Sequence, residues 1–431
     1  MVIMGSIIVI ATFYAIIKNF ETRLVLIASG LLMGIIGGNL SGAINEFSKG
    51  LVNSSLTPII CITMAFSAVL ETTGCSQHLV IVITRVLKRM RYIVIPMTVI
   101  LVWFINISLM SAAGLAAAVG TILIPTLIKL GIKPAMAGSA VLLGTWGYSV
   151  SPGNPFITQV SDLSGVSNMD IIMDFAPYAL IAVLVSAATL LIISIVTKEN
   201  IFHAKEIRSE DMNHVSELDG GEGLGNAKET VNYLYAIIPL VPIVLLIISS
   251  PLFKLLPEIS IVNSMLIGTL LCLVATRANI SDFTKSFFKG MGNGFVNIIC
   301  LIAAAGVFIQ GMNSIGLTQA LIDGMSQSVS LAKGSATFGP FILAAISGSG
   351  NAAILAFNGV VTPFAGNFGL TISDMGAVVQ ATGGIGRTLS PVAGVTLICA
   401  NLAKVNPIEL SKRNILPATM AAIVLMILIL F

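Results

Sequence analysis

Long apolar runs recur along the whole chain, separated by short polar stretches. They lie near residues 2–17, 24–40, 53–72, 92–108, 115–130, 135–160, 171–197, 232–250, 259–276, 291–312, 335–346, 352–367, 376–403 and 415–431. A transmembrane helix needs about 20 apolar residues, and about 17 can suffice. Of the 431 residues only 10% are charged, whereas soluble domains carry about 25% charged residues. The chain is therefore predicted to be an all-α integral membrane protein in a lipid bilayer.

The polar residues exclude several classes of function. The net charge of +3 is small and dispersed, so nucleic acid is not an expected partner. The five cysteines form no CxxC pair and the three histidines lack metal-ligand spacing, so no metal site or cofactor is predicted. No HExxH motif, no GxxxxGK[ST] motif and no paired intramembrane carboxylates appear, so the chain is not expected to be an enzyme.

Small polar residues interrupt the apolar runs at a few places. No charge occurs between Lys333 and Asp374, yet this run contains Ser347–Ala353, which reads SGSGNAA. Irregular backbone survives at membrane depth only where protein or a watery cavity surrounds it, so this stretch is predicted to be the tip of a re-entrant hairpin. The alternative is a close helix–helix contact, because Gly and Ser let helices approach.

The two halves of the chain resemble each other. Ser111 matches Ser349, and Pro152 matches Pro391, about 240 positions further on, and transporters commonly contain such internal repeats. The first repeat is predicted to cover 1–197, with a hairpin at 92–130 and a broken helix at 135–160. The second covers 231–431, with a hairpin at 335–367 and a broken helix at 376–403. Residues 198–230 form a polar linker.

The distribution of Lys and Arg predicts the orientation. Lys18 and Arg23 follow the first span, so the N-terminus should lie outside the cell and the linker 198–230 in the cytoplasm. The cluster Arg85–Arg91 and the residues Lys129 and Lys133 would then all lie inside. This requires either a hairpin between them or two full spans that violate the charge rule. Each repeat would contain five spans plus one hairpin. An odd number of spans makes the second repeat inverted, as in secondary transporters.

Arg387 is the most informative single residue. It is the only charge between Asp374 and Lys404, and an arginine inside the membrane is expensive enough to indicate a function. Its guanidinium could hold a carboxylate through two hydrogen bonds. The alternatives are that it reaches the membrane surface or holds backbone carbonyls of the broken helix. The hairpin tips and helix breaks would add helix N-termini, which favour anions.

Two motifs give the chain a family likeness. The segment Ser347–Ala353 and the segment Gly386–Val392, which reads GRTLSPV, resemble motifs of the anaerobic four-carbon-dicarboxylate carriers of the Dcu C type. That resemblance implies the ion-transporter superfamily, a homodimer and an elevator-type movement. It also implies a bacterial inner-membrane protein.

The resemblance implies a set of substrate-binding residues. In the second half they are Ser349, Gly350, Asn351, Arg387, Thr388 and Ser390, and in the first half, where the likeness is looser, Ser111 and Gly114. For a coupling ion we expect Ser151, Asn154 and Ser347.

The predicted function is secondary active transport of four-carbon dicarboxylates such as fumarate, succinate and malate, by exchange or by ion-coupled symport. The alternative is a carrier of the same fold for another substrate, such as an amino acid or a monocarboxylate. The coupling ion stays open between Na⁺ and H⁺.

Overall fold

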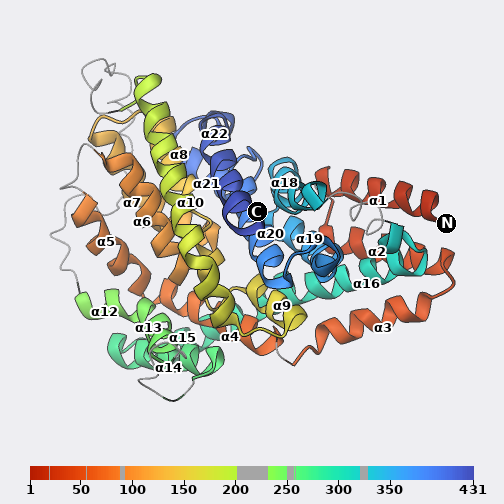
Figure 1. Cartoon of the computed structure of the whole chain (residues 1–431). Helices are drawn as coiled ribbons and strands as arrows, with labels where there is room; N and C mark the ends of the chain where they lie inside the picture. Colours follow the sequence, from red (N-terminus) through yellow and green to blue (C-terminus); the bar gives the residue numbers. More distant parts are fainter. Residues whose placement is uncertain are drawn as a thin grey trace.

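The computed structural model describes residues 1–18, 20–54, 56–87, 93–200, 232–249, 257, 259–320 and 329–431. All the regular elements in these ranges are helices (Figure 1). The predicted linker 198–230 lies outside the described residues from position 201 onward, and so do the side chains of the predicted basic cluster Arg85–Arg91.

The first half of the chain begins with apolar helices and ends with one long helix. Its elements are α1 (Val2–Ile17), α2 (Thr22–Ile36), α3 (Leu40–Leu51), α4 (Leu56–Thr72), α5 (Cys75–Leu87), α6 (Val94–Ser108), α7 (Ala112–Lys129), α8 (Pro134–Leu143), the 3₁₀ turn η2 (Gly147–Val150), α9 (Pro155–Ser164) and α10 (Asn168–Val196). The predicted arms 92–108 and 115–130 are α6 and α7, and the predicted break in 135–160 lies between α8 and α9.

The second half has the same order of elements. They are α12 (Tyr233–Ile237), η4 (Ile238–Leu240), α13 (Val241–Ser249), α14 (Ile261–Thr276), α15 (Ile280–Gly294), the π-helical turn η5 (Phe295–Ile299), α16 (Cys300–Ser314), α18 (Val329–Ser347), α19 (Gly350–Val360), η6 (Thr362–Phe368), α20 (Ile372–Arg387), α21 (Gly394–Ala403), α22 (Pro407–Leu425) and η7 (Met426–Leu430). Here α18 and α19 are the two arms, and the break lies between α20 and α21.

Hydropathy alone missed three helices. After the apolar run 53–72, only the basic cluster Arg85–Arg91 was recognised in the sequence, but the structure has helix α5 at Cys75–Leu87. Helices α3 and α15 precede the predicted spans 53–72 and 291–312. Both carry charged residues on one face, as amphipathic helices do, and a search for uniformly apolar runs passes over them.

The lengths of the helices fit a membrane protein. Among the described residues, four helical segments are long and apolar enough to cross a membrane unaided, namely Ala112–Lys129, Asn168–Val196, Ile280–Ser314 and Pro407–Leu430. Helices α3 and α4 form a bent pair with an angle of 45°. In Figure 1, α6, α7, α8 and α10 lie side by side with α22, while α1, α2, α3 and α16 extend away from them.

Helix packing forms two main groups. The first is the largest buried cluster, which joins α6, α7, α8, α10 and α20–α22 through residues such as Val99, Leu123 and Ala421 and also includes residues of α4, α5, α14 and α15. The second contains α1, α2 and α16 and reaches α19. In the second group α2 crosses α16 closely: a Cβ on Gly30 would lie 2.5 Å from the carbonyl oxygen of Val307. Only glycine permits this approach of two backbones.

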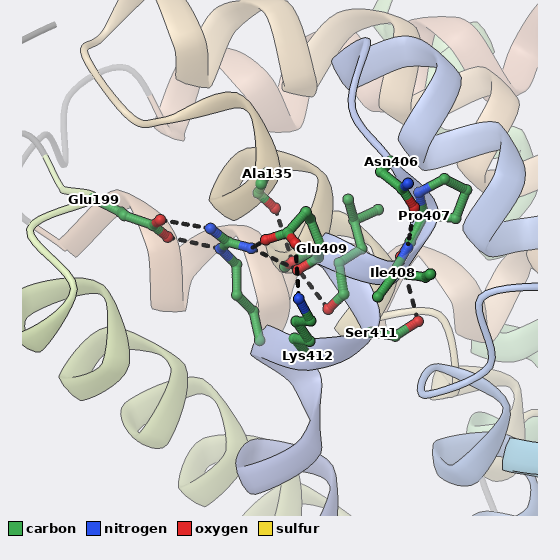
Figure 2. Close-up of polar contacts among 11 residues, drawn as sticks. Ala135, Glu199, Asn406, Pro407, Ile408, Glu409, Ser411 and Lys412 are labelled. Carbon is green, nitrogen blue, oxygen red and sulfur yellow. Dashed lines mark hydrogen bonds and ion pairs between the residues drawn. The ribbon is translucent and has the colours of Figure 1, made fainter.

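One buried ion pair ties three elements of the first group together. The Nε of Arg413 in α22 donates a hydrogen bond of 2.7 Å to Oε2 of Glu199, which follows α10. Its Nη1 donates to the carboxylate of Glu409 at 2.9 Å, and the carbonyl of Glu199 accepts from the backbone N–H of Lys133 at 3.3 Å. Figure 2 shows Glu199 and Glu409 on either side of this guanidinium.

We expect Arg413→Ala to destabilise the protein strongly. The Glu199 side chain is only 7% exposed, and removing one partner of a buried ion pair costs about 3–5 kcal/mol. Lys285→Ala is the matched control, because Lys285 and Asp282 are 3.9 Å apart with side chains 77% and 69% exposed, and such pairs contribute about 1 kcal/mol or less. Thermal unfolding in detergent measures both. Equal melting temperatures for the two variants would contradict the assignment of this ion pair as a stabilising contact.

Candidate functional site

The two hairpin turns and the two helix breaks meet around one cavity of about 320 Å³. Each of the four segments contributes to its wall. The lining residues are Ile60, Met64, Met110, Ser111, Ala112, Ala113, Tyr148, Gly153, Asn154, Pro155, Phe156, Asn297, Ile298, Gly348, Ser349, Gly350, Asn351, Arg387, Gly394 and Val395. Residues far apart in the sequence thus surround a single space, and Arg387 is the only charged residue among these.

Among the described residues, four helices begin at this cavity. Ser111, Ser349 and Asn154 cap α7, α19 and α9, accepting hydrogen bonds from the N–H groups of Gly114, Ala352 and Phe156. Helix α21 begins at Gly394 without a side-chain cap. The first turn of a helix has unsatisfied N–H groups and carries the positive end of the helix dipole. Four such ends around one cavity favour a bound anion.

Arg387, the last residue of α20, adds a full positive charge to the cavity. Its Nη2 donates a hydrogen bond of 2.9 Å to the carbonyl oxygen of Thr145 in the first break. Its guanidinium lies over the ring of Tyr148, 5.7 Å from the centroid, and its Nε is buried with no partner among the described residues. Arg387 therefore holds a backbone carbonyl, as one of the alternatives from the sequence expected, and it also lines the cavity. Its binding of a carboxylate stays a prediction.

Buried amides hold the first break in place. Asn106 in α6 donates to the carbonyl of Leu109 at 2.7 Å and accepts from the N–H of Tyr148 at 3.1 Å. Gln380 in α20 donates to the carbonyl of Ser149 at 2.9 Å and accepts from the amide of Asn154 at 2.5 Å. Because unpaired buried backbone groups are costly, these amides stabilise the broken segments that carry the cavity.

Two glycines at the site are required by the backbone, one by a close contact and one by its φ angle. A Cβ on Gly147 would lie 1.9 Å from the carbonyl oxygen of Trp103, so no other residue allows the first break to pass so near α6. Gly348, at the tip of the second hairpin, has φ of 74°, a conformation that other residues rarely adopt.

Six of the predicted site residues line the cavity. Five of them were expected to bind substrate and one, Asn154, to bind an ion. They are Ser111, Asn154, Ser349, Gly350, Asn351 and Arg387.

The other five predicted residues lie outside the cavity lining. The hydroxyl of Thr388 donates to the carbonyl of Ile385 in its own helix, and that of Ser347 donates to Leu343. Ser151 is buried within the first break, and Gly114 lies beside the carboxylate of Glu71.

Ser390 is the fifth of these residues. It is completely buried and its hydroxyl has no partner among the described residues. Its Oγ lies 3.2 Å from the position of a Cβ on Gly348, so it packs against the second hairpin tip.

Sequence reasoning missed part of the wall. Ile60 and Met64 come from α4, and Asn297 and Ile298 come from η5. Their signal in the sequence is weak, because Ile and Met are ordinary in an apolar helix. Tyr148, next to the first break, also lines the cavity. No cluster of His, Cys, Asp and Glu suited to a metal ion occurs among the residues that the structure describes.

The fold and the cavity together define an all-helical membrane transporter. Two solved transporter structures share the fold. Neisseria gonorrhoeae MtrF is 12% identical, with a TM-score of 0.59 over 91% of this chain and 84% of that chain. The YdaH transporter of Alcanivorax borkumensis is also 12% identical, with a TM-score of 0.59 over 94% of this chain and 95% of that chain.

The chain belongs to the DcuC family of C4-dicarboxylate anaerobic carriers, whose family model matches residues 2–431. The anaerobic C4-dicarboxylate transporter DcuC of Escherichia coli K12 is 25% identical over 99% of this chain and 95% of that protein. A putative uncharacterized transporter of Haemophilus influenzae is 37% identical over 62% of this chain and 94% of that protein. The family resemblance expected from Ser347–Ala353 and Gly386–Val392 is thereby confirmed. The chain is a transporter and not an enzyme.

We expect Arg387→Ala to abolish binding of a carboxylate substrate in the cavity. The change removes the charge and also frees the carbonyl of Thr145, which Arg387 holds. Arg387→Lys keeps the charge but lacks the planar fork, so it should recover binding only in part. Isothermal titration of the purified variants measures the affinity, and the melting temperature controls for folding. Wild-type affinity in Arg387→Ala would remove this residue from the site.

Proposed function

We propose that this protein is a secondary active transporter of four-carbon dicarboxylates such as fumarate, succinate and malate. The observation that carries the proposal is the meeting of four helix N-termini and Arg387 around a cavity with no acidic residue in its lining, among the residues described. Such a site attracts a small anion with more than one negative charge. Membership of the DcuC family supports the same substrate class.

The two ends of a dicarboxylate would meet similar groups. One half of the chain supplies Ser111 and the N-termini of α7 and α9, and the other half supplies Ser349, Asn351 and the N-termini of α19 and α21. We infer that each carboxylate takes N–H and hydroxyl donors from one hairpin tip and one break. Arg387 would add a charge-assisted hydrogen bond to one of them.

We further infer that the halves, 1–197 and 231–431, are two inverted repeats. The order of elements supports this: α3 and α4 correspond in position to α15 and α16, and α8 and α9 correspond to α20 and α21. The contacts between the halves follow the same correspondence. Helix α4 packs on α15 and α3 packs on α16, while α8 packs on α21 and α9 packs on α20, so the first member of each pair contacts the second member of the matching pair. Such repeats allow two related states with the site open to opposite sides.

An elevator-type movement is our proposal for the mechanism. The hairpins and broken helices would move as one body with the substrate, relative to the body formed by α1–α4 and α13–α16. Packing supports this division, because α4 packs chiefly on α15 and α14, and α16 packs chiefly on α2 and α3. The protein would work as a homodimer in the bacterial inner membrane, with the N-terminus outside and the linker 198–230 in the cytoplasm.

Coupling to Na⁺ or H⁺, or exchange without an ion, remains part of the proposal. Unwound backbone at a helix break presents carbonyl oxygens, which are the ligands that bind Na⁺ in such sites. The residues proposed for an ion are Ser151, Asn154 and Ser347. Of these, Asn154 lines the cavity, so an ion there would lie next to the substrate.

We expect purified protein in liposomes loaded with succinate to take up labelled fumarate. Labelled aspartate and lactate serve as the comparison substrates, and Na⁺ and pH gradients are varied separately. The dianion should move in preference to lactate, because the four helix ends and Arg387 interact more strongly with two negative charges. Uptake of aspartate or of lactate without any uptake of fumarate would replace the proposed substrate by the alternative class.

A further inference from the structure

The cavity has a wall that neither a hairpin nor a helix break supplies. This wall consists of Ile60 and Met64 of α4 and Asn297 and Ile298 of η5. Three of the four residues are apolar. Asn297 is therefore the only group on this wall that can form a strong hydrogen bond with a polar solute.

The Asn297 amide is not used by the protein itself. It makes no hydrogen bond with any residue in the described part of the chain, although most buried amides near the cavity do, as Asn106, Asn154 and Gln380 show. The residue is exposed, and it lines the cavity. Both its N–H₂ donors and its oxygen acceptor are thus available to a ligand.

The backbone at Asn297 is unusual. Residues Phe295–Ile299 form a π-helical turn inside the otherwise continuous segment Ile280–Ser314. Such turns are rare, and they are frequent at functional sites because the extra residue redirects a side chain. The corresponding segment of the first half is also interrupted, since α3 ends at Leu51 and α4 begins at Leu56.

In the elevator-type movement proposed above, Asn297 belongs to a different body from Ser111, Ser349 and Arg387. The turn η5 packs chiefly against α4, α15 and α16, whereas Ser111, Ser349 and Arg387 belong to the hairpins and broken helices. If these bodies move relative to one another, a contact with Asn297 exists in only one of the two end states.

We propose that Asn297 donates a hydrogen bond to a substrate carboxylate in the state shown by this structure and loses that bond when the site moves to the other side. This inference rests on the proposed transport of dicarboxylates. It assigns Asn297 as a substrate-contacting residue of the stationary body, which makes the substrate affinity differ between the two faces of the membrane.

The test is the KM for succinate measured from each face of the membrane, in right-side-out and inverted vesicles that contain the full chain. Asn297→Ala should raise KM about tenfold from one face, as expected for the loss of a hydrogen bond to a charged group, and less than twofold from the other. Asn297→Asp should raise KM further from the same face, because a second anion then faces the substrate. Asn297→Gln keeps the amide and should recover part of the affinity.

Asn293→Ala is the matched control. Asn293 lies one turn earlier in the same segment, in α15, and does not line the cavity, so KM should stay unchanged from both faces. The melting temperature of each variant separates a folding defect from a lost contact. A KM for Asn297→Ala that is unchanged from both faces, or raised equally from both, would overturn the inference. Wild-type vesicles that move no dicarboxylate would overturn the proposed function and this inference with it.

Discussion

The structure depends on how helices are broken inside an apolar protein. Each break leaves backbone N–H and C=O groups without the partners that a continuous helix provides, and water is not at hand to replace them. In the first break, Asn106 and Gln380 bind the backbone at Tyr148 and Ser149, and Arg387 binds the carbonyl of Thr145. These three side chains come from α6 and α20, so each half of the chain helps to hold the break.

The same breaks produce the charge of the site. A helix that begins at depth presents its positive end there, and the hairpins and breaks place four such ends around one cavity. Arg387 reinforces this potential while serving as a structural donor. Under the proposed function, Arg387 would bind an anion and also stabilises the broken backbone, which would offset the cost of an arginine at this position.

The fold was largely predictable from local properties of the sequence. Uniform apolar runs identified most of the membrane helices, and small polar residues within such runs located the tips at Ser111 and Ser349. The glycine, serine and proline residues around Arg387 located the break after α20. The amphipathic helices α3 and α15 were missed because their apolar residues are spaced along one face, and a search for continuous apolar runs cannot register that pattern.

The cavity was only partly predictable, because the direction of a side chain depends on tertiary packing. Arg387 and Thr388 are neighbours in the sequence, yet one lines the cavity and the other bonds to its own helix. In the sequence, Asn106, Gln380 and Asn297 cannot be told apart, because each is an amide side chain within a largely apolar stretch. Packing places Asn106 and Gln380 inside the protein and Asn297 at the cavity. No residue pattern in the sequence predicts the π-helical turn that contains Asn297.

The sequence by itself determined an all-helical membrane protein with polar breaks, since hydropathy is a local property. Only the tertiary structure decided which polar groups face one another, since that requires helices from both halves of the chain to meet.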